Sequence, residues 1–150
     1  MAMGIALVTG ATSGIGEEFC WQLAAAHHDL VLVARREEKL RKLAEDLRQI
    51  AGVKAEVIVA DLGVAGDVDR VAQRLSDEQS PVGLLVNNAG FALGCSFIDN
   101  TIEAEENALD VMVRAPMVLS YAALNAMRAR GRGAIINVSS VASETGAGTY

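Results

Sequence analysis

Cysteine is scarce in this sequence, and its scarcity excludes two ways of building a small protein. The chain of 150 residues has two cysteines, Cys20 and Cys95. Two cysteines cannot form a disulfide framework, and these two do not have metal-ligand spacing. We therefore expect no metal site and regard both as small core or near-core residues, while their number leaves open whether one is a reactive thiol.

Long apolar runs and an excess of basic residues are also missing. No apolar stretch approaches the ~20 residues that a membrane-spanning helix needs, and the first four residues carry no basic segment of the kind that opens a secretory signal. With 13 lysines and arginines against 19 acidic residues, the net charge is −6. We therefore expect neither membrane nor nucleic acid as a partner, and a reducing cytoplasm as the location.

The composition favours one globular domain with alternating strands and helices. Apolar residues make up 51% of the chain, and a chain of this length buries one substantial core, so we expect a single domain over residues 1–150. The expected strands are Ile5–Val8, Leu30–Ala34, Ala55–Ala60, Val82–Val86 and Ala134–Val138. Between them lie segments of helical periodicity near 14–26, 40–47 and 68–75, and a long one from an N-cap at Thr101 to about Arg130, bent or broken near Pro116. This alternation predicts an α/β fold with a doubly wound parallel sheet.

The most informative segment follows the first strand. Gly10, Gly14 and Gly16 have Gly-x-x-x-Gly-x-Gly spacing. Gly10 lets the chain turn sharply, and the other two remove side chains where a diphosphate approaches the backbone and where a helix packs close to a strand. The free N–H groups and the dipole of the helix that follows then face the phosphates. The segment therefore predicts a nucleotide cofactor.

Further motifs follow this turn in a particular order. After the turn itself, Thr9–Gly16, they are Asp61–Leu62, Asn87–Gly90, Asn137–Ser140 and Tyr150. In these motifs the whole chain resembles the short-chain dehydrogenase/reductase family, which implies a Rossmann-type dinucleotide-binding fold. The resemblance also implies a set of cofactor-binding residues: Gly10, Thr12, Ser13, Gly14, Ile15, Gly16, Asp61, Leu62, Asn87, Ala89 and Gly90.

Alternative interpretations of two of these motifs remain open. By resemblance, Asp61 bonds the adenine amino group and Asn87 lies along the ribose. From the residues alone, Asp61 is equally suited to an Asx turn or a cap for a helix at Val64. Asn87 and Asn88 are equally suited to a turn whose amides bond neighbouring backbone, and both uses are compatible with cofactor binding.

Arg35 and Arg36 directly follow the second strand, where a dinucleotide fold places the adenosine ribose. An acidic residue there would bond the 2′-hydroxyl, whereas a guanidinium matches a phosphate. We therefore favour NADP(H) over NAD(H) as the cofactor. The alternative is that both arginines belong to the solvated start of the next helix, as Lys39 and Lys42 do.

The resemblance also implies the catalytic residues. Ser140 would bond the substrate oxygen, and Tyr150 would transfer the proton, aided by a lysine four positions later, at position 154. We therefore expect this chain to be truncated after the fifth strand, with the C-terminal units and the substrate loop outside it. Tyr121 is expected to pack within a helix. The interval from Ser140 to Tyr150 is shorter than is usual in the family, and Met112 stands where the family often has an asparagine of the proton relay.

The expected function is an NADP(H)-dependent oxidoreductase that interconverts a small-molecule carbonyl and an alcohol. The alternative is an inactive NADP(H)-binding sensor or scaffold. A phosphoryl-transfer enzyme is disfavoured because Gly16 is followed by Glu17 and not by lysine. We also expect a homo-oligomer, dimer or tetramer, formed through the long helix, whose apolar content exceeds what one face needs; alternatively, other parts of the protein cover that face.

Overall fold

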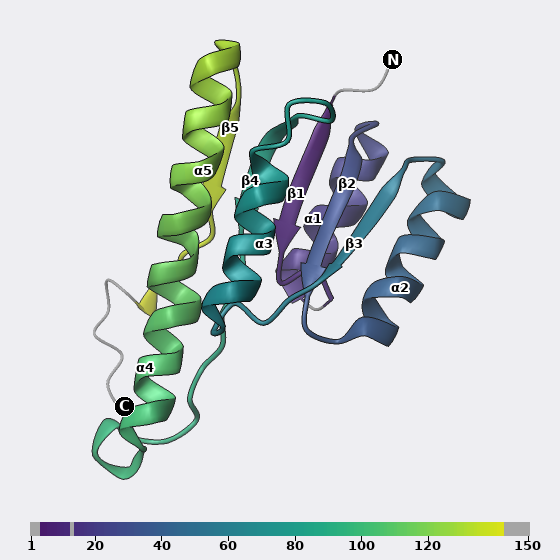
Figure 1. Cartoon of the computed structure of the whole chain (residues 1–150). Helices are drawn as coiled ribbons and strands as arrows, with labels where there is room; N and C mark the ends of the chain where they lie inside the picture. The colour runs from purple at the N-terminus through teal and green to yellow at the C-terminus, as the bar shows by residue number, and fades with distance from the viewer. Residues whose placement is uncertain (1–3, 13, 143–150) are drawn as a thin grey trace.

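A five-stranded parallel sheet forms the centre of the fold (Figure 1). The computed structural model describes residues 4–12 and 14–142, so the predicted site residues Ser13 and Tyr150 lie outside the described part. The strands are β1 (Ile5–Thr9), β2 (Asp29–Ala34), β3 (Ala55–Val59), β4 (Val82–Asn87) and β5 (Ala134–Asn137). Their order in the sheet is β3-β2-β1-β4-β5, and every neighbouring pair is parallel.

Helices cover both faces of this sheet. They are α1 (Gly14–Ala25), α2 (Glu37–Asp46), α3 (Ala65–Leu75), α4 (Ile102–Leu109) and α5 (Ala115–Arg130). Buried side chains of α1 and α2 pack on one face, and those of α3 and α5 pack side by side on the other. The expected doubly wound parallel sheet is therefore confirmed. The strand order changes direction between β1 and β4, which is where such sheets bind ligands, beyond the carboxyl ends of the strands.

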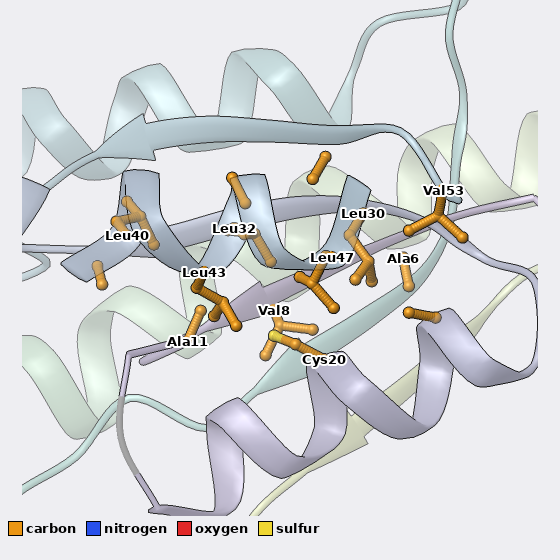
Figure 2. Close-up of a cluster of buried hydrophobic side chains, with 14 of the residues drawn as sticks. Ala6, Val8, Ala11, Cys20, Leu30, Leu32, Leu40, Leu43, Leu47 and Val53 are labelled. Atoms are coloured by element: carbon orange, nitrogen blue, oxygen red, sulfur yellow. The ribbon is translucent and has the colours of Figure 1, made fainter. Parts of the chain in front are cut away.

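The two faces of the sheet have separate cores because successive side chains of a strand point to opposite sides. In β1, Val8 belongs to the cluster beneath α1 and α2, whereas Leu7 belongs to the cluster beneath α3 and α5. Figure 2 shows the first cluster, which includes Leu32 of β2, Leu40 of α2 and Cys20 of α1. Nearly continuous burial of β1 and β2 explains their unbroken apolar sequences.

The long helical segment begins at the expected cap and is irregular near Pro116, as expected. Thr101 caps α4, since its side chain accepts a hydrogen bond from the Ala104 N–H at 3.3 Å. The break is a π-helical turn, Asp110–Arg114, that precedes Pro116 rather than coinciding with it. Pro116 lies in the first turn of α5. Its missing N–H costs little there, so the irregular hydrogen bonds are displaced to the turn before it.

Other expectations about burial were wrong at the outer parts of the molecule. Tyr121 is 73% exposed on α5 rather than packed, because Leu119 and Ala123 supply the buried face of that helix. Most of β5 is exposed, since it lies at the edge of the described sheet. Within the described residues, no helix is both long and apolar enough to cross a membrane.

Candidate functional site

Side chains join β1 and β4 at their carboxyl ends. Thr9 Oγ1 accepts hydrogen bonds from the backbone N–H groups of Asn88 (3.0 Å) and Ala89 (3.1 Å), and it donates to the carbonyl of Val86 (3.4 Å). The Asn88 side-chain amide donates to the carbonyls of Thr9 (3.1 Å) and Gly10 (3.2 Å). These bonds join the carboxyl ends of β1 and β4 at the point where the strand order changes direction.

The glycine turn packs against this junction so closely that Gly10 and Gly16 have no room for a side chain. Gly10 has a φ of 65°, and a Cβ there would lie 2.9 Å from Ala89 Cα. A Cβ on Gly16 would overlap the Gly10 carbonyl oxygen, so only glycine allows α1 to start this close to β1. Gly14 has a φ of 53°, and a Cβ added there would meet no atom of the described residues within 4 Å, so space is open at the start of α1.

A cleft of about 430 Å³ lies beside this turn and gathers most of the predicted cofactor residues. Its predicted members are Gly10, Thr12, Arg35, Arg36, Asp61, Leu62, Ala89 and Gly90. Both arginines are exposed at the end of β2 and line the cleft. The lysines further along α2 are exposed on its surface, where Lys42 pairs with Asp46 at 2.7 Å.

Asp61 forms an Asx turn, one of the two local structures that the sequence allowed for it. Its Oδ1 accepts a hydrogen bond from the Gly63 N–H at 2.9 Å, and its own N–H donates to Asp67 Oδ2 at 2.8 Å. The hydrogen bond from Arg70, and after it the one from the Asp61 N–H, lowers the pKa of Asp67 below its ordinary value. These bonds shape the turn that carries Leu62 into the wall of the cleft.

A larger cavity of about 980 Å³ adjoins the cleft and contains Ser140. The two spaces have five residues in common: Leu62, Ala89, Gly90, Phe91 and Val111. Ser140 reaches the cavity from the loop after β5, where its Oγ accepts a hydrogen bond from the Ala142 N–H at 3.2 Å. Asn87, Ser120 and Asn137 line the cavity as well. A nucleotide in the cleft and a polar group at Ser140 would therefore occupy connected spaces.

The remaining wall of the cavity is largely apolar. Phe91, Phe97 and Met117 line it, together with Met112, which is 42% exposed. A Cβ on Gly90 would lie 3.5 Å from the Met112 sulfur, so Met112 lies directly against the Asn87–Gly90 segment. A thioether is a weak acceptor and no donor, so this position supplies no polar relay.

The two cysteines have opposite environments, and the expectation for one of them was wrong. Cys20 is buried, as expected; burial and the charge of Glu17 raise the pKa of its thiol to about 12. Cys95 is exposed and lines the larger cavity. It lies in the irregular segment after β4, which has no periodicity from which its exposure could have been predicted.

Sequence reasoning assigned no specific role to Thr9 and did not count Asn88 among the site residues. The signal for Thr9 was a hydroxyl at the last position of an otherwise aliphatic strand, directly before a glycine. The suggestion that Asn88 bonds neighbouring backbone is correct. Of the remaining predicted residues, Gly14, Ile15 and Gly16 form the first turn of α1, with the Ile15 side chain exposed.

Comparison with known proteins agrees with this geometry. A family model described as short chain dehydrogenase matches residues 4–150. A very-long-chain 3-oxoacyl-CoA reductase from Laccaria bicolor is 37% identical over 139 residues, which are 91% of this chain and 41% of that protein. The bulky-bulky ketone specific alcohol dehydrogenase from Comamonas testosteroni is 33% identical, with a TM-score of 0.93 over 97% of this chain and 58% of that one.

A short-chain dehydrogenase from Sphingobium yanoikuyae, solved in complex with NADPH, is 36% identical, with a TM-score of 0.93 over 97% of this chain and 56% of that one. The chain thus spans about half the length of these relatives. Because the family model extends over almost all of the sequence and the sheet order agrees with the motifs, the chain belongs to the short-chain dehydrogenase family.

Proposed function

We propose that the full-length protein is an NADP(H)-dependent oxidoreductase that interconverts a carbonyl and an alcohol. One observation carries the proposal: the cleft that holds the glycine turn and two exposed arginines opens into the cavity that contains Ser140. A volume of about 430 Å³ is within the range of small-ligand sites. The NADPH complex of the Sphingobium yanoikuyae relative supports the choice of cofactor.

The residues of the cleft fit a dinucleotide with a phosphate on its ribose. Gly14 leaves open space at the start of α1, where N–H groups and the helix dipole favour a diphosphate. Arg35 and Arg36 present guanidinium groups at the end of β2, which suits a further phosphate. Leu62 offers an apolar surface between the two spaces, and Asp61 lies beside it as an acceptor for an amino group.

The nicotinamide of such a cofactor supplies the hydride chemistry when it is bound. Ser140 would bond the oxygen of the substrate carbonyl and hold it in the larger cavity. Tyr150 would give that oxygen a proton in reduction and take one in oxidation, and the lysine expected four positions later would keep the pKa of the phenol near neutral pH. The apolar wall formed by Phe91, Phe97 and Met117 supports an apolar carbonyl compound as the substrate.

The test is turnover by the full-length protein. We expect it to oxidise NADPH with at least one of a panel of apolar ketones and aldehydes. Ser140→Ala should lower kcat by about 100-fold or more, since it removes a hydrogen bond to the oxygen on which charge develops. Ser76→Ala, at an exposed serine after α3 that lines neither space, is the control and should retain turnover. Wild-type protein that binds NADPH but reduces no carbonyl would reject the proposal.

Met112 supports a second candidate, an NADP(H)-binding sensor without catalysis, because it leaves the cavity without the amide that the family often has there. This candidate requires tight NADPH binding and no hydride transfer in the full-length protein. Turnover that is lost in Tyr150→Phe would dispose of it.

A homo-oligomer is also part of the proposal. An exposed apolar stripe follows the long helical segment and consists of Leu109, Val113, Met117, Tyr121 and Leu124, of which Val113 and Met117 also line the larger cavity. Their spacing of three or four residues places them along one helix face. Contact between two copies through this stripe would bury it. Light scattering of the full-length protein would reveal the oligomer, and a monomer at micromolar concentration would argue that other parts of the chain cover the stripe.

A further inference from the structure

Asn87 is one of two buried polar residues in the part of the chain that the structure describes; Thr9 is the other. The hydroxyl of Thr9 is fully used in joining β1 to β4. Asn87 is 7% exposed, and its side chain has a different set of partners. Its Nδ2 donates to Ser120 Oγ at 3.1 Å and to Asn137 Oδ1 at 2.9 Å. One amide group therefore connects β4 with both α5 and β5.

The two hydrogen bonds donated by Nδ2 fix the orientation of the Asn87 side-chain amide. Asn87 Oδ1 is buried and has no hydrogen-bond partner among the residues that the structure describes, whereas both hydrogens of Nδ2 have one. A buried N–H group that loses its partner costs free energy, so both bonds resist displacement of the groups that accept them. Both partners accept a hydrogen from the same amide nitrogen, which serine, with a single hydroxyl hydrogen, could not supply.

The strand that this amide contacts pairs with β4 alone in the described sheet. β5 has four residues, each paired with a residue of β4. Its register with β4 ends at the pair Asn87 and Asn137. Beyond that pair, the Val138 N–H donates to the Asn87 carbonyl at 2.9 Å. Asn87 thus bonds β5 with both its backbone and its side chain at the point where the chain leaves the sheet.

Ser140 follows Asn137 by three residues and lies in the loop that this anchor starts. We propose that Asn87 is a positioning residue, which holds the end of β5 against α5 and thereby sets the place of Ser140 in the cavity. This inference rests on the proposed function, because it assumes that Ser140 contacts the substrate. It gives the Asn87 side chain a role that does not depend on contact with the cofactor.

Two substitutions test the proposal in the full-length protein. Asn87→Leu removes both donors, and Asn137→Ala removes one acceptor at an exposed position. We expect each to lower kcat by about 10- to 100-fold, the scale of a small misplacement of a reacting group, while the Kd of Asn137→Ala for NADPH changes by about twofold or less. Asn125→Ala, an exposed asparagine of α5, is the matched control and should leave both constants at the wild-type values.

A further readout separates positioning from general destabilisation. The double variant should have the kcat of the worse single variant, because both changes break one connection. Wild-type kcat in Asn137→Ala, additive losses, or a loss of NADPH affinity in Asn137→Ala parallel to its loss of kcat would overturn the positioning role. Wild-type protein without turnover would instead overturn the proposed function, and this inference with it.

Discussion

The side-chain oxygen of Thr9 lies 3.0 Å from the backbone nitrogen of Asn88 and accepts its hydrogen bond. The two residues are 79 positions apart in the sequence, yet the bond joins the carboxyl ends of the two central strands. The glycine turn, the Asn87–Gly90 segment and the cleft between them all start at this junction. Its integrity therefore decides both the stability of the sheet and the shape of the site.

Removing the Thr9 hydroxyl should destabilise the fold. Thr9→Val keeps the shape of the side chain but leaves the N–H groups of Asn88 and Ala89 without their acceptor, at a cost of about 1–3 kcal/mol in the free energy of unfolding. Urea denaturation measures this loss. Thr9→Ser restores the acceptor and should recover most of the stability, so equal losses in the two variants would contradict the role of the hydroxyl.

A methyl group at Gly16 should push α1 away from β1. Gly16→Ala places a Cβ against the Gly10 carbonyl, and we expect a loss of about 1–3 kcal/mol in unfolding free energy from overpacking. Gly66→Ala is the control because Gly66, in α3, has no neighbour within 4 Å of an added Cβ. That change should be neutral or should stabilise the protein by up to about 1 kcal/mol. Thermal denaturation compares the two, and equal effects would refute the close approach.

Arg35→Ala should weaken NADPH binding by about 10-fold or more, because a charge-assisted hydrogen bond to phosphate is lost. Affinity for NADH should not change, since NADH lacks that phosphate. Calorimetric titration with each dinucleotide measures both effects, and Lys39→Ala, an exposed position on α2, is the control. An unchanged preference for NADPH in the Arg35 variant would assign the arginine to the solvated helix start.

The two cysteines should differ in reactivity. Burial and Glu17 raise the pKa of Cys20 to about 12, so the folded protein has almost no Cys20 thiolate at neutral or mildly alkaline pH. Iodoacetamide should therefore modify the exposed Cys95 and spare Cys20, as peptide mass spectrometry can show. Unfolding in urea should make both thiols react. Equal labelling of the two in the folded protein would mean that Cys20 is accessible.

Stability should fall in acid partly through Asp67. The hydrogen bonds from Arg70 and the Asp61 N–H hold the pKa of Asp67 below its ordinary value of 3.8. As the pH falls, the Asp67 carboxyl is therefore protonated at a higher pH in the unfolded chain than in the folded protein. Its contribution to the free energy of unfolding is complete above the ordinary pKa and is lost as the pH falls through the lowered pKa of the folded state. Asp67→Asn should show a shallower decline in this range than wild type. Asp69→Asn, an exposed position on the same helix, should decline as wild type does.

Elements with regular periodicity could be predicted closely from the sequence, and irregular ones could not. The strand Ile5–Val8 was expected and β1 is Ile5–Thr9, because an apolar run that ends at a glycine turn is a local signal. The long helix was expected to be bent or broken near Pro116, and the π-helical turn Asp110–Arg114 lies directly before that proline, but the sequence did not show which turn would be irregular. Proline reveals that a helix is perturbed, but the turn that absorbs the perturbation depends on what packs around it.

The residue pattern alone determined the α/β architecture, the parallel sheet and the glycine turn, since strand periodicity, helix periodicity and turn chemistry are properties of short segments. Only the tertiary structure decided which side chains meet. It buried Cys20 and exposed Cys95, and it brought Asn87 within hydrogen-bonding distance of Ser120 and Asn137, which are 33 and 50 positions away. The physical reason is that burial and polar partners depend on how strands align and helices pack, and these contacts join residues that no local pattern relates.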